Sequence, residues 1–424
     1  MSAEINNYDV AVIGAGPAGL AAALAAEAEG AKVTLIEREE MLGGILKQCI
    51  HDGFGLLRYG EKLSGPEYSY KDIAKIEKSG VDIRLQSFVT HIGNGAPFTI
   101  TLSTALGMQN ITAKALVLAT GCRERTARQV FIHGDRPSGV ITAGAAQHYV
   151  NLMGHMPCKK CVVLGSGDIG LIMARRLTLE GAEVLGVYEA KPTPSGLSRN
   201  IAQCLNDFDI PLYCSKTVTR VFGQKRLEKV EISSVDENMK PIAGTEEIIE
   251  CDGLILSVGL IPENELAETL GVQLHPATKG PVCDQHYGTN IPGVYCCGNA
   301  LLVNDLVDYV SESGETAGKN AAVYAKSVVE PVETTTPYAD ISIDKNFLCI
   351  APQRINLNQL EPEIAIFFRS RDERGKSEVT ASLNGKELFK KHYQTLRPPE
   401  MEKVIVKLDG IDLQPGDILE FRMN

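Results

Sequence analysis

A spacing of three glycines occurs twice in this chain, and each time it joins a short apolar strand to a helix. The first copy lies in residues 8–37 and the second in residues 161–189. In such a strand–turn–helix unit, the first glycine permits a tight turn, the second lets the backbone approach a pyrophosphate, and the third allows the helix to pack on the strand. The six glycines are Gly14, Gly16 and Gly19 in the first copy, and Gly165, Gly167 and Gly170 in the second.

An acidic residue ends the second strand of each copy. Glu37 lies 18 residues past Gly19, and Glu189 lies 19 residues past the last glycine of the second copy. A carboxylate at this point accepts hydrogen bonds from ribose hydroxyls, and it repels a 2′-phosphate. The second copy is therefore expected to prefer NAD over NADP. Lys191 and Arg199 leave NADP open, because a basic side chain nearby accommodates the phosphate.

The two halves of the chain continue with the same plan. Alternating, strand-like stretches follow each copy, and each half ends in an apolar strand that runs into a glycine, at 115–121 and at 254–259. Such a repeat predicts an α/β fold with two Rossmann-like dinucleotide-binding domains, one for a flavin and one for a nicotinamide.

The last part of the chain has a different pattern. From residue 338 onward, short alternating runs such as EIAIFFRS and SEVTASLNG are separated by turn signals, which predicts a small all-β domain. A covering or partner-binding role is expected for it. The expected organisation is residues 1–125, first part of the FAD-binding domain; 126–262, NAD(P)-binding domain; 263–330, second part of the FAD-binding domain; 331–337, linker; and 338–424, β domain.

Charge and composition exclude several functions. The formal net charge of −11 argues against a nucleic-acid partner, because phosphate binding needs clustered lysine and arginine. The first residues lack the features of a signal peptide, and the apolar run from Val10 to Ala26 is too rich in glycine for a membrane span. We therefore expect a cytoplasmic protein with reduced cysteines and no transmembrane segment; a homo-oligomer is left open.

Four motifs carry a resemblance to a known superfamily. They are the first glycine copy, the ATG of Ala119–Gly121, the second glycine copy and the segment IPGVYCCGNA at 291–300. With them, residues 8 to about 328 resemble the FAD/NAD(P) flavoproteins with two dinucleotide-binding domains, the pyridine nucleotide-disulfide oxidoreductase superfamily of glutathione and thioredoxin reductases. In that superfamily the last motif wraps the flavin, usually through Gly-Asp. This chain has Gly298-Asn299 there, and the asparagine amide can still form hydrogen bonds.

Residues 119–150 resemble a narrower group. They are similar to the alpha subunits of sarcosine oxidase, the B subunit of hydrogen cyanide synthase and the A subunits of opine oxidase, and still more to flavoproteins associated with glycerol-3-phosphate dehydrogenase. This resemblance implies an enzyme: the NAD(H)-linked, FAD-dependent electron-transfer subunit of a multi-subunit dehydrogenase or oxidase of glycerol-3-phosphate or amino-acid/amine type. The implied partners are a small cysteine-rich carrier and a second flavoprotein dehydrogenase subunit.

Twenty-one positions are expected to contact the two cofactors. The expected FAD contacts are Gly14, Gly16, Pro17, Ala18, Gly19, Glu37, Arg38, Gly43, Gly44, Ala119, Thr120, Gly121, Gly298 and Asn299. The expected NAD contacts are Gly165, Gly167, Asp168, Ile169, Gly170, Glu189 and Gly259.

A single thiol follows the glycine pair Gly43-Gly44. Flavin-dependent disulfide reductases of the superfamily carry two spaced thiols on a helix that starts there, whereas this chain has only Cys49 between residues 42 and 60. A disulfide needs two cysteines with Cα atoms within about 7 Å. A lone thiol cannot form such a disulfide. Cys49 remains a candidate catalytic residue, but a role as a small buried apolar residue is the simpler expectation. His51 is a second candidate, and a structural hydrogen bond is the simpler role for it.

The CKKC motif at 158–161 supports a rival interpretation. Cys161 runs directly into a predicted strand, whereas a reactive thiolate is favoured at the start of a helix. Two alternatives remain beside the electron-transfer subunit: a free-standing NADH oxidase or thiol/disulfide reductase that uses Cys158 and Cys161, and a scaffold subunit with a structural flavin. No metal site is expected, because the vicinal pair Cys296-Cys297 has no matching CxxC motif near it in the sequence.

Overall fold

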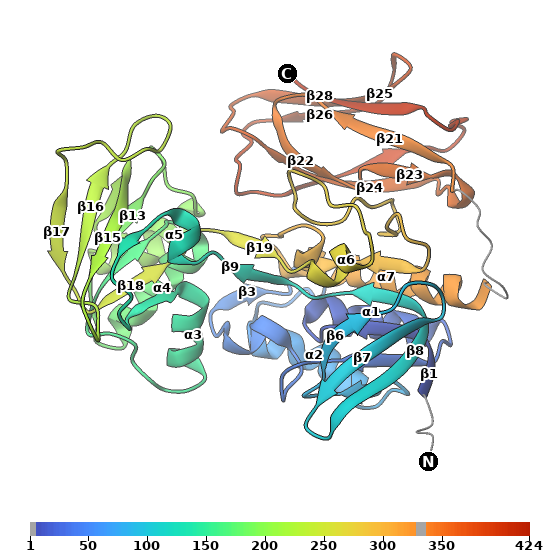
Figure 1. The fold of residues 1–424 in the computed structure, drawn as a ribbon. Helices are drawn as coiled ribbons and strands as arrows, with labels where there is room; N and C mark the ends of the chain where they lie inside the picture. The colour runs from blue at the N-terminus through green and yellow to red at the C-terminus, as the bar shows by residue number, and fades with distance from the viewer. Residues whose placement is uncertain (1–5, 328–335) are drawn as a thin grey trace. The chain divides into compact units, whose positions relative to one another are not determined.

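The computed structural model describes residues 6–327 and 336–424 and contains two compact units. The first unit comprises Met1–Cys122 and Pro262–Asn424, and the second comprises Arg123–Ile261, which is inserted into the first (Figure 1). The chain passes from one unit to the other within β9 (Cys122–Glu124) and returns at β19 (Leu260–Pro262). Among the described residues, no helix is long and apolar enough to cross a membrane.

A seven-stranded sheet forms the centre of the first unit, in the order β5-β2-β1-β8-β7-β6, with β20 also paired to β8. The pairs β5–β2, β2–β1, β1–β8 and β8–β20 are parallel, whereas β6, β7 and β8 form an antiparallel meander. The strands are β1 (Asn6–Ile13), β2 (Val33–Ile36), β5 (Asp82–Arg84), β6 (Phe88–Ile92), β7 (Phe98–Thr104), β8 (Gly107–Leu118) and β20 (Val294–Cys296).

Two helices of the first unit pack unusually closely on each other. They are α1 (Pro17–Ala28), which is rich in alanine, and α7 (Val307–Ser327). At Gly314 and Gly318 of α7, an added Cβ would lie 2.1 Å from the carbonyl oxygens of Ala18 and Ala22. These glycines therefore let α7 lie directly against the helix that follows the first glycine turn. The other helices described in the first unit include α2 (Gly65–Ile76) and the shorter η1 (Gly44–Gln48), α6 (Glu265–Thr269) and η4 (Gly298–Ala300). The strands β3 (Asp52–Phe54) and β4 (Leu63–Ser64) form a small antiparallel pair.

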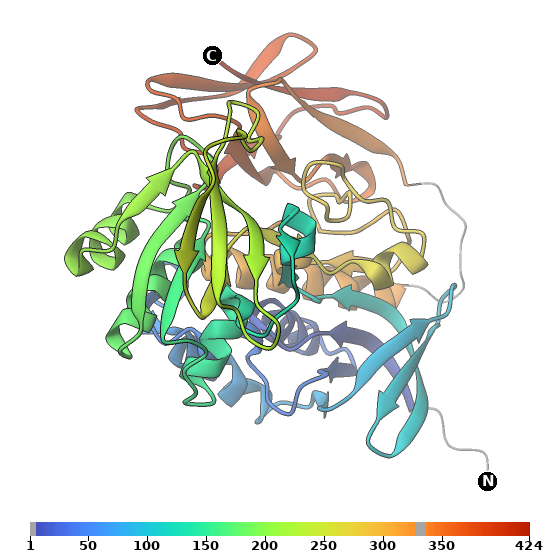
Figure 2. The ribbon, with the colours of Figure 1, turned by 60° about the vertical axis from the view of Figure 1, so that its left-hand side comes forward.

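The second unit repeats the plan of the first, with a parallel sheet in the order β11-β18-β12-β13-β14 and a mixed sheet in the order β10-β15-β16-β17 (Figure 2). In the mixed sheet the pair β10–β15 is parallel and the other two pairs are antiparallel. The strands of the parallel sheet are β11 (Val140–Thr142), β12 (Lys160–Leu164), β13 (Glu183–Glu189), β14 (Leu212–Cys214) and β18 (Gly253–Leu256). The other sheet has β10 (His133–Gly134), β15 (Lys216–Phe222), β16 (Lys229–Ser234) and β17 (Glu247–Glu250). The helices are η2 (Ala127–Val130), α3 (Ala143–Asn151), α4 (Asp168–Leu179), α5 (Ser198–Cys204) and η3 (Asn206–Phe208).

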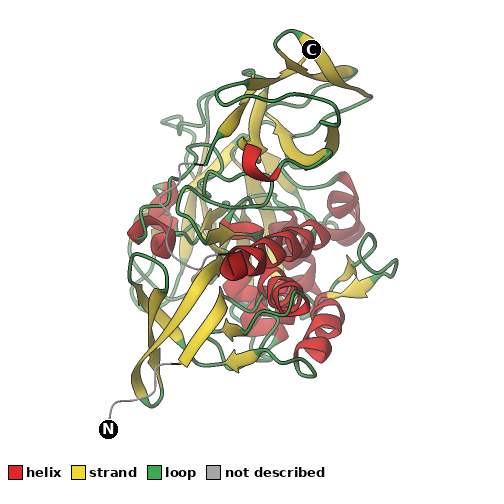
Figure 3. Cartoon of the chain, turned by 90° about the vertical axis from the view of Figure 1, so that its right-hand side faces the viewer, coloured by secondary structure: helices red, strands yellow, loops and turns green. Residues whose placement is uncertain are grey.

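The C-terminal β region, residues 338–424, consists almost entirely of strands and loops (Figure 3). Two sheets, in the orders β23-β21-β28-β25-β26 and β22-β24-β27, enclose a core that includes Phe347, Phe368 and Phe421. The strands are β21 (Tyr338–Ile343), β22 (Phe347–Ala351), β23 (Arg354–Asn356), β24 (Glu363–Ser370), β25 (Ser377–Leu383), β26 (Lys386–Tyr393), β27 (Glu402–Lys407) and β28 (Ile418–Met423); η5 (Leu357–Gln359) follows β23.

These elements confirm the predicted fold class: an α/β fold with two Rossmann-like units and a C-terminal β region. The β region belongs to the first unit, because Cys349, Ala351, Phe367 and Met401 share the core of its central sheet. Most of the predicted linker at 331–337 lies outside the described residues.

Candidate functional site

The first glycine turn lies between β1 and α1, and two of its three glycines are required by packing. Gly14 has a φ of +102°, and an added Cβ there would lie 2.4 Å from the carbonyl oxygen of Ala119 at the end of β8. At Gly19 an added Cβ would lie 1.7 Å from the carbonyl oxygen of Gly14. These positions admit no side chain, whatever the turn binds.

The middle glycine of the same turn has room for a side-chain carbon. The nearest described atom to a Cβ on Gly16 would be the Cα of Gly44, at 4.0 Å. Gly16 is also the N-cap of α1, and no described side chain caps this helix. The N–H groups of its first turn, after Pro17, are thus available for an anion, which the helix dipole also favours. Such N–H groups are the donors that a pyrophosphate would need, and we call this N-terminus of α1 the first cradle.

Glu37 is held beside the first glycine turn by two backbone N–H groups. Its Oε2 accepts from Ala15 at 2.8 Å, its Oε1 accepts from Glu39 at 2.9 Å, and only 7% of the residue is exposed. The carboxylate therefore has a defined position at the end of β2, as recognition of a ribose requires. The next residue, Arg38, points to solvent and pairs with Glu263 at 3.4 Å.

Predicted residues from distant parts of the chain line this cradle. Gly43 donates its N–H to the carbonyl oxygen of Ala15 at 2.9 Å, and a Cβ on Gly44 would lie 2.8 Å from the Cα of Gly16. Gly298 has a φ of +63°, and an added Cβ there would lie 2.8 Å from the Cβ of Ala18. The structure thus brings the glycine pair and the segment that contains Gly298 together at the start of α1.

The ATG motif directly follows the neighbouring strand β8. Gly121 has a φ of +72°, and no described atom lies within 4 Å of a Cβ added to it. The hydroxyl of Thr120 donates to the carbonyl oxygen of Glu263 at 2.6 Å. The Asn299 amide is also engaged within the protein, because its Oδ1 accepts from the N–H of Asn304 at 3.0 Å and its Nδ2 lies 3.7 Å from the Cys122 sulfur.

Asn264 is a residue of this site that the sequence motifs missed. It is 4% exposed, and its Nδ2 donates to the carbonyl oxygens of Ala300, at 2.8 Å, and Lys279, at 3.0 Å. Its Oδ1 is buried and has no partner among the described residues. Asn264 thus holds the turn that contains Gly298 and keeps one acceptor free. Its position five residues past the glycine that follows β18 was the only sequence signal for it.

The second glycine turn divides its roles in the same way. A Cβ on Gly165 would lie 2.0 Å from the carbonyl oxygen of Ser257, and one on Gly170 would lie 2.5 Å from that of Gly165. The nearest described atom to a Cβ on Gly167 would be Ser257 Oγ, at 3.8 Å. Gly259 has a φ of +104°. The nearest described atom to a Cβ added there would belong to the Arg125 side chain, at 3.8 Å.

Glu189 repeats the hydrogen bonds of Glu37 and adds two more. Its carboxylate accepts from the N–H groups of Ser166 and Lys191, each at 3.0 Å, as Glu37 accepts from Ala15 and Glu39. It also accepts from the hydroxyls of Ser166, at 2.6 Å, and Ser195, at 3.1 Å. The two serines are residues that the motifs missed, and they immobilise the acid that was expected to select NAD.

A segment after β13 lies across the start of α4. Asp168, the first residue of α4, accepts hydrogen bonds from the N–H of Leu197 at 2.9 Å and from Asn200 Nδ2 at 2.7 Å. The next residue, Ile169, is 37% exposed. The segment that contains Ser195 therefore forms one wall beside the second glycine turn.

Cys49 has none of the features of a reactive thiol. The expected helix after the glycine pair is only the short 3-10 helix η1, and Cys49 is its C-cap. The Cys49 thiol donates to the carbonyl oxygen of Ile45 at 3.3 Å, and burial raises its pKa to about 12. His51 lies against Phe54, with ring centroids 4.9 Å apart, and its Nδ1 is 3.2 Å from the carbonyl oxygen of Asp52.

We expect Cys49→Ser to leave the rate of flavin reduction by NADH within about tenfold of wild type, or about 1.4 kcal/mol in barrier. With a pKa of about 12, the thiol stays protonated through pH 9, so it supplies no thiolate to the reaction. Stopped-flow experiments at pH 7 and pH 9 measure the rate of flavin reduction. Raising the pH from 7 to 9 should produce no thiolate-to-flavin absorption band. A much larger loss with FAD still bound would show that the thiol takes part in the chemistry.

Cys158 and Cys161 are close to each other but buried. Their exposed fractions are 3% and 0%, and Cys161 lies in β12 between two parallel neighbours, as expected from the sequence. The hydrogen bond between the thiols lowers the pKa of Cys158 and raises that of Cys161. A disulfide substrate needs an accessible thiolate, so this burial argues against the reductase interpretation. In the described parts of the chain, no three His, Cys, Asp or Glu side chains gather to hold a metal ion.

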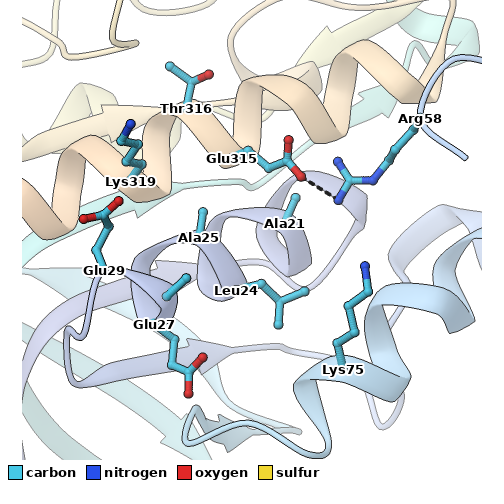
Figure 4. A pocket seen from close by; sticks show the side chains of 11 residues that line it. Ala21, Leu24, Ala25, Glu27, Glu29, Arg58, Lys75, Glu315, Thr316 and Lys319 are labelled. Atoms are coloured by element: carbon cyan, nitrogen blue, oxygen red, sulfur yellow. Dashed lines mark ion pairs between the residues drawn. The ribbon is translucent and has the colours of Figure 1, made fainter.

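A surface pocket of about 580 Å³ lies in the first unit (Figure 4). It is lined by residues of α1, α2 and α7, including Leu24, Lys75 and Lys319, and contains none of the predicted site residues. At its edge Arg58 pairs with Glu315 at 2.8 Å and with the buried Asp72 at 3.0 Å. Acidic and basic side chains are balanced here, and we assign no ligand to this pocket.

Known proteins are similar to this chain over more than half of its length. A family model described as pyridine nucleotide-disulphide oxidoreductase matches residues 8–351. The A subunit of opine oxidase from Agrobacterium tumefaciens is 26% identical over 79% of this chain and 68% of its own length. HcnB, the hydrogen cyanide synthase subunit of Pseudomonas protegens, is 27% identical, over 62% of this chain and 58% of its own. The alpha subunit of sarcosine oxidase from Rhizobium meliloti is 27% identical over 61% of this chain but only 25% of its own length.

A solved structure supports the fold. Thioredoxin reductase of Lactococcus lactis matches with a TM-score of 0.62 and 22% identity, over 76% of this chain and all of that one. The resemblance expected from the motifs is thereby confirmed, both to the superfamily and to the three oxidase and synthase subunits.

Proposed function

We propose, from the premise that this chain belongs to the pyridine nucleotide-disulphide oxidoreductase family, that it is an FAD-dependent NAD(H) oxidoreductase serving as the NAD-linked electron-transfer subunit of a multi-subunit dehydrogenase or oxidase. One observation carries this proposal. Both glycine turns share one pattern, in which packing leaves no room for a Cβ on the outer glycines, a Cβ on the middle glycine would fit, and an acid is held by two backbone N–H groups.

The residues of the first unit fit FAD, which the family typically binds together with NAD(P). The free N–H groups at the start of α1 would bind the pyrophosphate, and Glu37 would accept hydrogen bonds from the ribose. The unpartnered Oδ1 of Asn264 offers a further acceptor beside Gly298. Bound FAD would supply the redox chemistry, because a flavin takes up electrons in pairs and releases them singly or in pairs.

The second unit fits a nicotinamide dinucleotide. The N-terminus of α4 would accept its pyrophosphate, and Gly167, where a Cβ would meet no closer atom than Ser257 Oγ at 3.8 Å, would let it approach the backbone. Ser166 and Ser195 hold Glu189 where a ribose 2′-hydroxyl is recognised. A scaffold with a structural flavin would have no need for this second, fully formed site, and this favours the enzyme over the scaffold.

The thiols and the relatives together support a partner as the electron acceptor or donor. Cys49 stays protonated, and Cys158 and Cys161 are buried, so the described chain offers no accessible dithiol relay. The similar proteins include subunits of opine oxidase and sarcosine oxidase. We infer a second flavoprotein subunit that oxidises glycerol 3-phosphate or an amino acid or amine, and a small cysteine-rich carrier between the two.

Steady-state oxidation of NADH with three acceptors side by side tests the function. The purified protein should contain non-covalent FAD, turn over slowly with oxygen, faster with an artificial dye, and not at all with a disulfide. Alone it should not oxidise glycerol 3-phosphate or sarcosine. Efficient, saturable disulfide reduction that is lost in Cys158→Ser would overturn the proposal in favour of a reductase.

NADH should reduce the flavin faster than NADPH in anaerobic stopped-flow experiments. The reason is that the Glu189 carboxylate would accept a hydrogen bond from the ribose 2′-hydroxyl of NADH and would repel the 2′-phosphate of NADPH. Glu189→Ala should reduce the ratio of the NADH rate to the NADPH rate. Ser195→Ala removes one hydrogen bond to Glu189 but keeps the Glu189 charge, so NADH should remain preferred. Equal rates for wild type would show that Lys191 or Arg199 determines nucleotide choice.

A further inference from the structure

The loop between η4 and α7 connects two parts of the proposed flavin site. It starts just after Gly298-Asn299 and ends at the N-terminus of α7, the helix that packs on α1. Within the loop, the N–H of Asn304 donates to Asn299 Oδ1 at 3.0 Å, and Asn304 Nδ2 donates to the carbonyl oxygen of Leu302 at 2.6 Å. The position of Asn299 therefore depends on the course of this loop, residues 301–306.

The C-terminal β region holds this loop through Arg369 of β24. Arg369 Nη2 donates to the carbonyl oxygen of Val303 at 3.2 Å and to Asp305 Oδ1 at 3.1 Å. The other oxygen of Asp305 accepts the N–H of Met401 at 3.2 Å. Both carboxylate oxygens of Asp305 thus accept hydrogen bonds from the β region. The β region therefore holds Val303 and Asp305, the two residues that flank Asn304.

The environment makes this contact strong. The side chains of Arg369 and Asp305 are only 12% and 19% exposed, so water screens their attraction little. The Arg369 guanidinium is itself fixed at its other nitrogen, where Nη1 donates to the carbonyl oxygens of Pro398 and Pro399. Removal of one partner would leave the other charge largely buried and unpaired, which is costly.

Further contacts bind the start of α7 to the same surface. The rings of Tyr309 and Phe367 meet edge to face with centroids 5.3 Å apart, and Lys403 of β27 pairs with Glu312. The β region therefore contacts residues 303, 305, 309 and 312 in succession. These contacts span the loop and the first turns of the helix behind it.

We propose that Arg369 is a positioning residue for the flavin, through which the C-terminal β region holds the loop of Asn304 and thereby Asn299. This inference rests on the proposed function, because it assumes that FAD occupies the first cradle. A bound ligand gains affinity when the groups around it are held in place beforehand. The match to the family model ends at residue 351, so Arg369 lies in a part of the chain to which that model assigns nothing.

Arg371 supplies a matched control two residues along the chain. Its guanidinium donates to the carbonyl oxygens of Lys345, at 2.9 Å, and Phe347, at 3.3 Å, both within the β region. Arg371→Ala should therefore lower the thermal stability of the β region without a change at the flavin loop. Arg369→Ala should affect both.

The test is FAD titration of the apoprotein, followed by visible circular dichroism and the midpoint potential of the bound flavin. Arg369→Ala should weaken FAD binding by about tenfold or more and change the dichroism and the potential, whereas Arg371→Ala should stay within about threefold of wild type. Arg369→Lys, which keeps the charge, should recover part of the affinity. If Arg369→Ala does not fold, Asp305→Asn, which removes only the charge of the partner, should show the same flavin effects in weaker form.

The possible results distinguish a failure of the Arg369 inference from a failure of the proposed function. Wild-type protein that takes up no FAD would overturn the proposed function together with this inference. Wild-type protein that binds FAD, beside folded variants at Arg369 or Asp305 with unchanged affinity, dichroism and potential, would overturn the inference alone. Equal flavin effects of Arg371→Ala would also overturn it, because they would reduce the role of Arg369 to general stability.

Discussion

Gly16→Val should give a folded protein that no longer binds FAD. The backbone at Gly16 has φ −73° and ψ −176°, an extended conformation that valine adopts readily. The added Cβ would find its nearest described neighbour at 4.0 Å, so the turn can accept it. The side chain would, however, fill the space where the pyrophosphate must approach the N–H groups of α1.

We expect FAD affinity to fall at least about a hundredfold, or about 2.8 kcal/mol. Fluorescence titration of the apoprotein with FAD measures the loss, and thermal unfolding of the two apoproteins shows whether the fold is retained. Gly19→Ala is the matched control for a packing effect, because its Cβ would lie 1.7 Å from the carbonyl oxygen of Gly14. It should destabilise the apoprotein itself. A yellow Gly16→Val protein with wild-type FAD content would refute the assignment of the first cradle.

The Gly167→Val protein should still bind FAD, but NADH should no longer reduce the bound FAD. Gly167 also has an extended backbone, with φ −65° and ψ 161°, and a Cβ there would have Ser257 Oγ as its nearest described neighbour at 3.8 Å. Valine would therefore fit the turn and exclude a pyrophosphate from the start of α4. The first glycine turn is unchanged in this variant, so FAD content should equal that of wild type.

Anaerobic stopped-flow experiments with increasing NADH measure this effect. The apparent affinity for NADH should fall at least about a hundredfold, while dithionite should still reduce the flavin fully. Gly170→Ala is the matched control, because its Cβ would lie 2.5 Å from the carbonyl oxygen of Gly165 and disturb the turn itself. Normal reduction by NADH in Gly167→Val would mean that the nucleotide binds elsewhere, and the role of the second unit would have to be revised.

Much of the fold could be predicted because its signals are local. A strand, three spaced glycines, a helix and an acid occupy about thirty residues, and each copy folds as one βαβ unit. Strands of the C-terminal β region such as β24 and β25 were also visible as alternating runs. β26 (Lys386–Tyr393) was not among them, because it is a charged strand at the edge of its sheet and shows little apolar alternation.

The glycine pair shows where a local pattern misled. The expected thiol-bearing helix is a short 3-10 helix that stops at Cys49. A Cβ on Gly65 at the start of α2 would lie 2.6 Å from the carbonyl oxygen of Cys49 and 2.8 Å from its Cβ, so the two segments are in close contact. This contact, between residues sixteen positions apart, restricts the thiol in a way that its neighbours in the sequence do not reveal.

By itself the sequence determined the two glycine turns, the acids that end their second strands and the parallel sheets around them, because the requirements of a tight turn and a packed helix are met by residues close together in the chain. Only the tertiary structure decided which glycines have room for a Cβ, that Ser166 and Ser195 immobilise Glu189, and that Asn264 supports the turn at Gly298. It also decided that Arg369 reaches Asp305 across 64 residues of chain. Hydrogen bonds of this kind depend on where separate elements meet, and packing of the whole chain sets those meeting points.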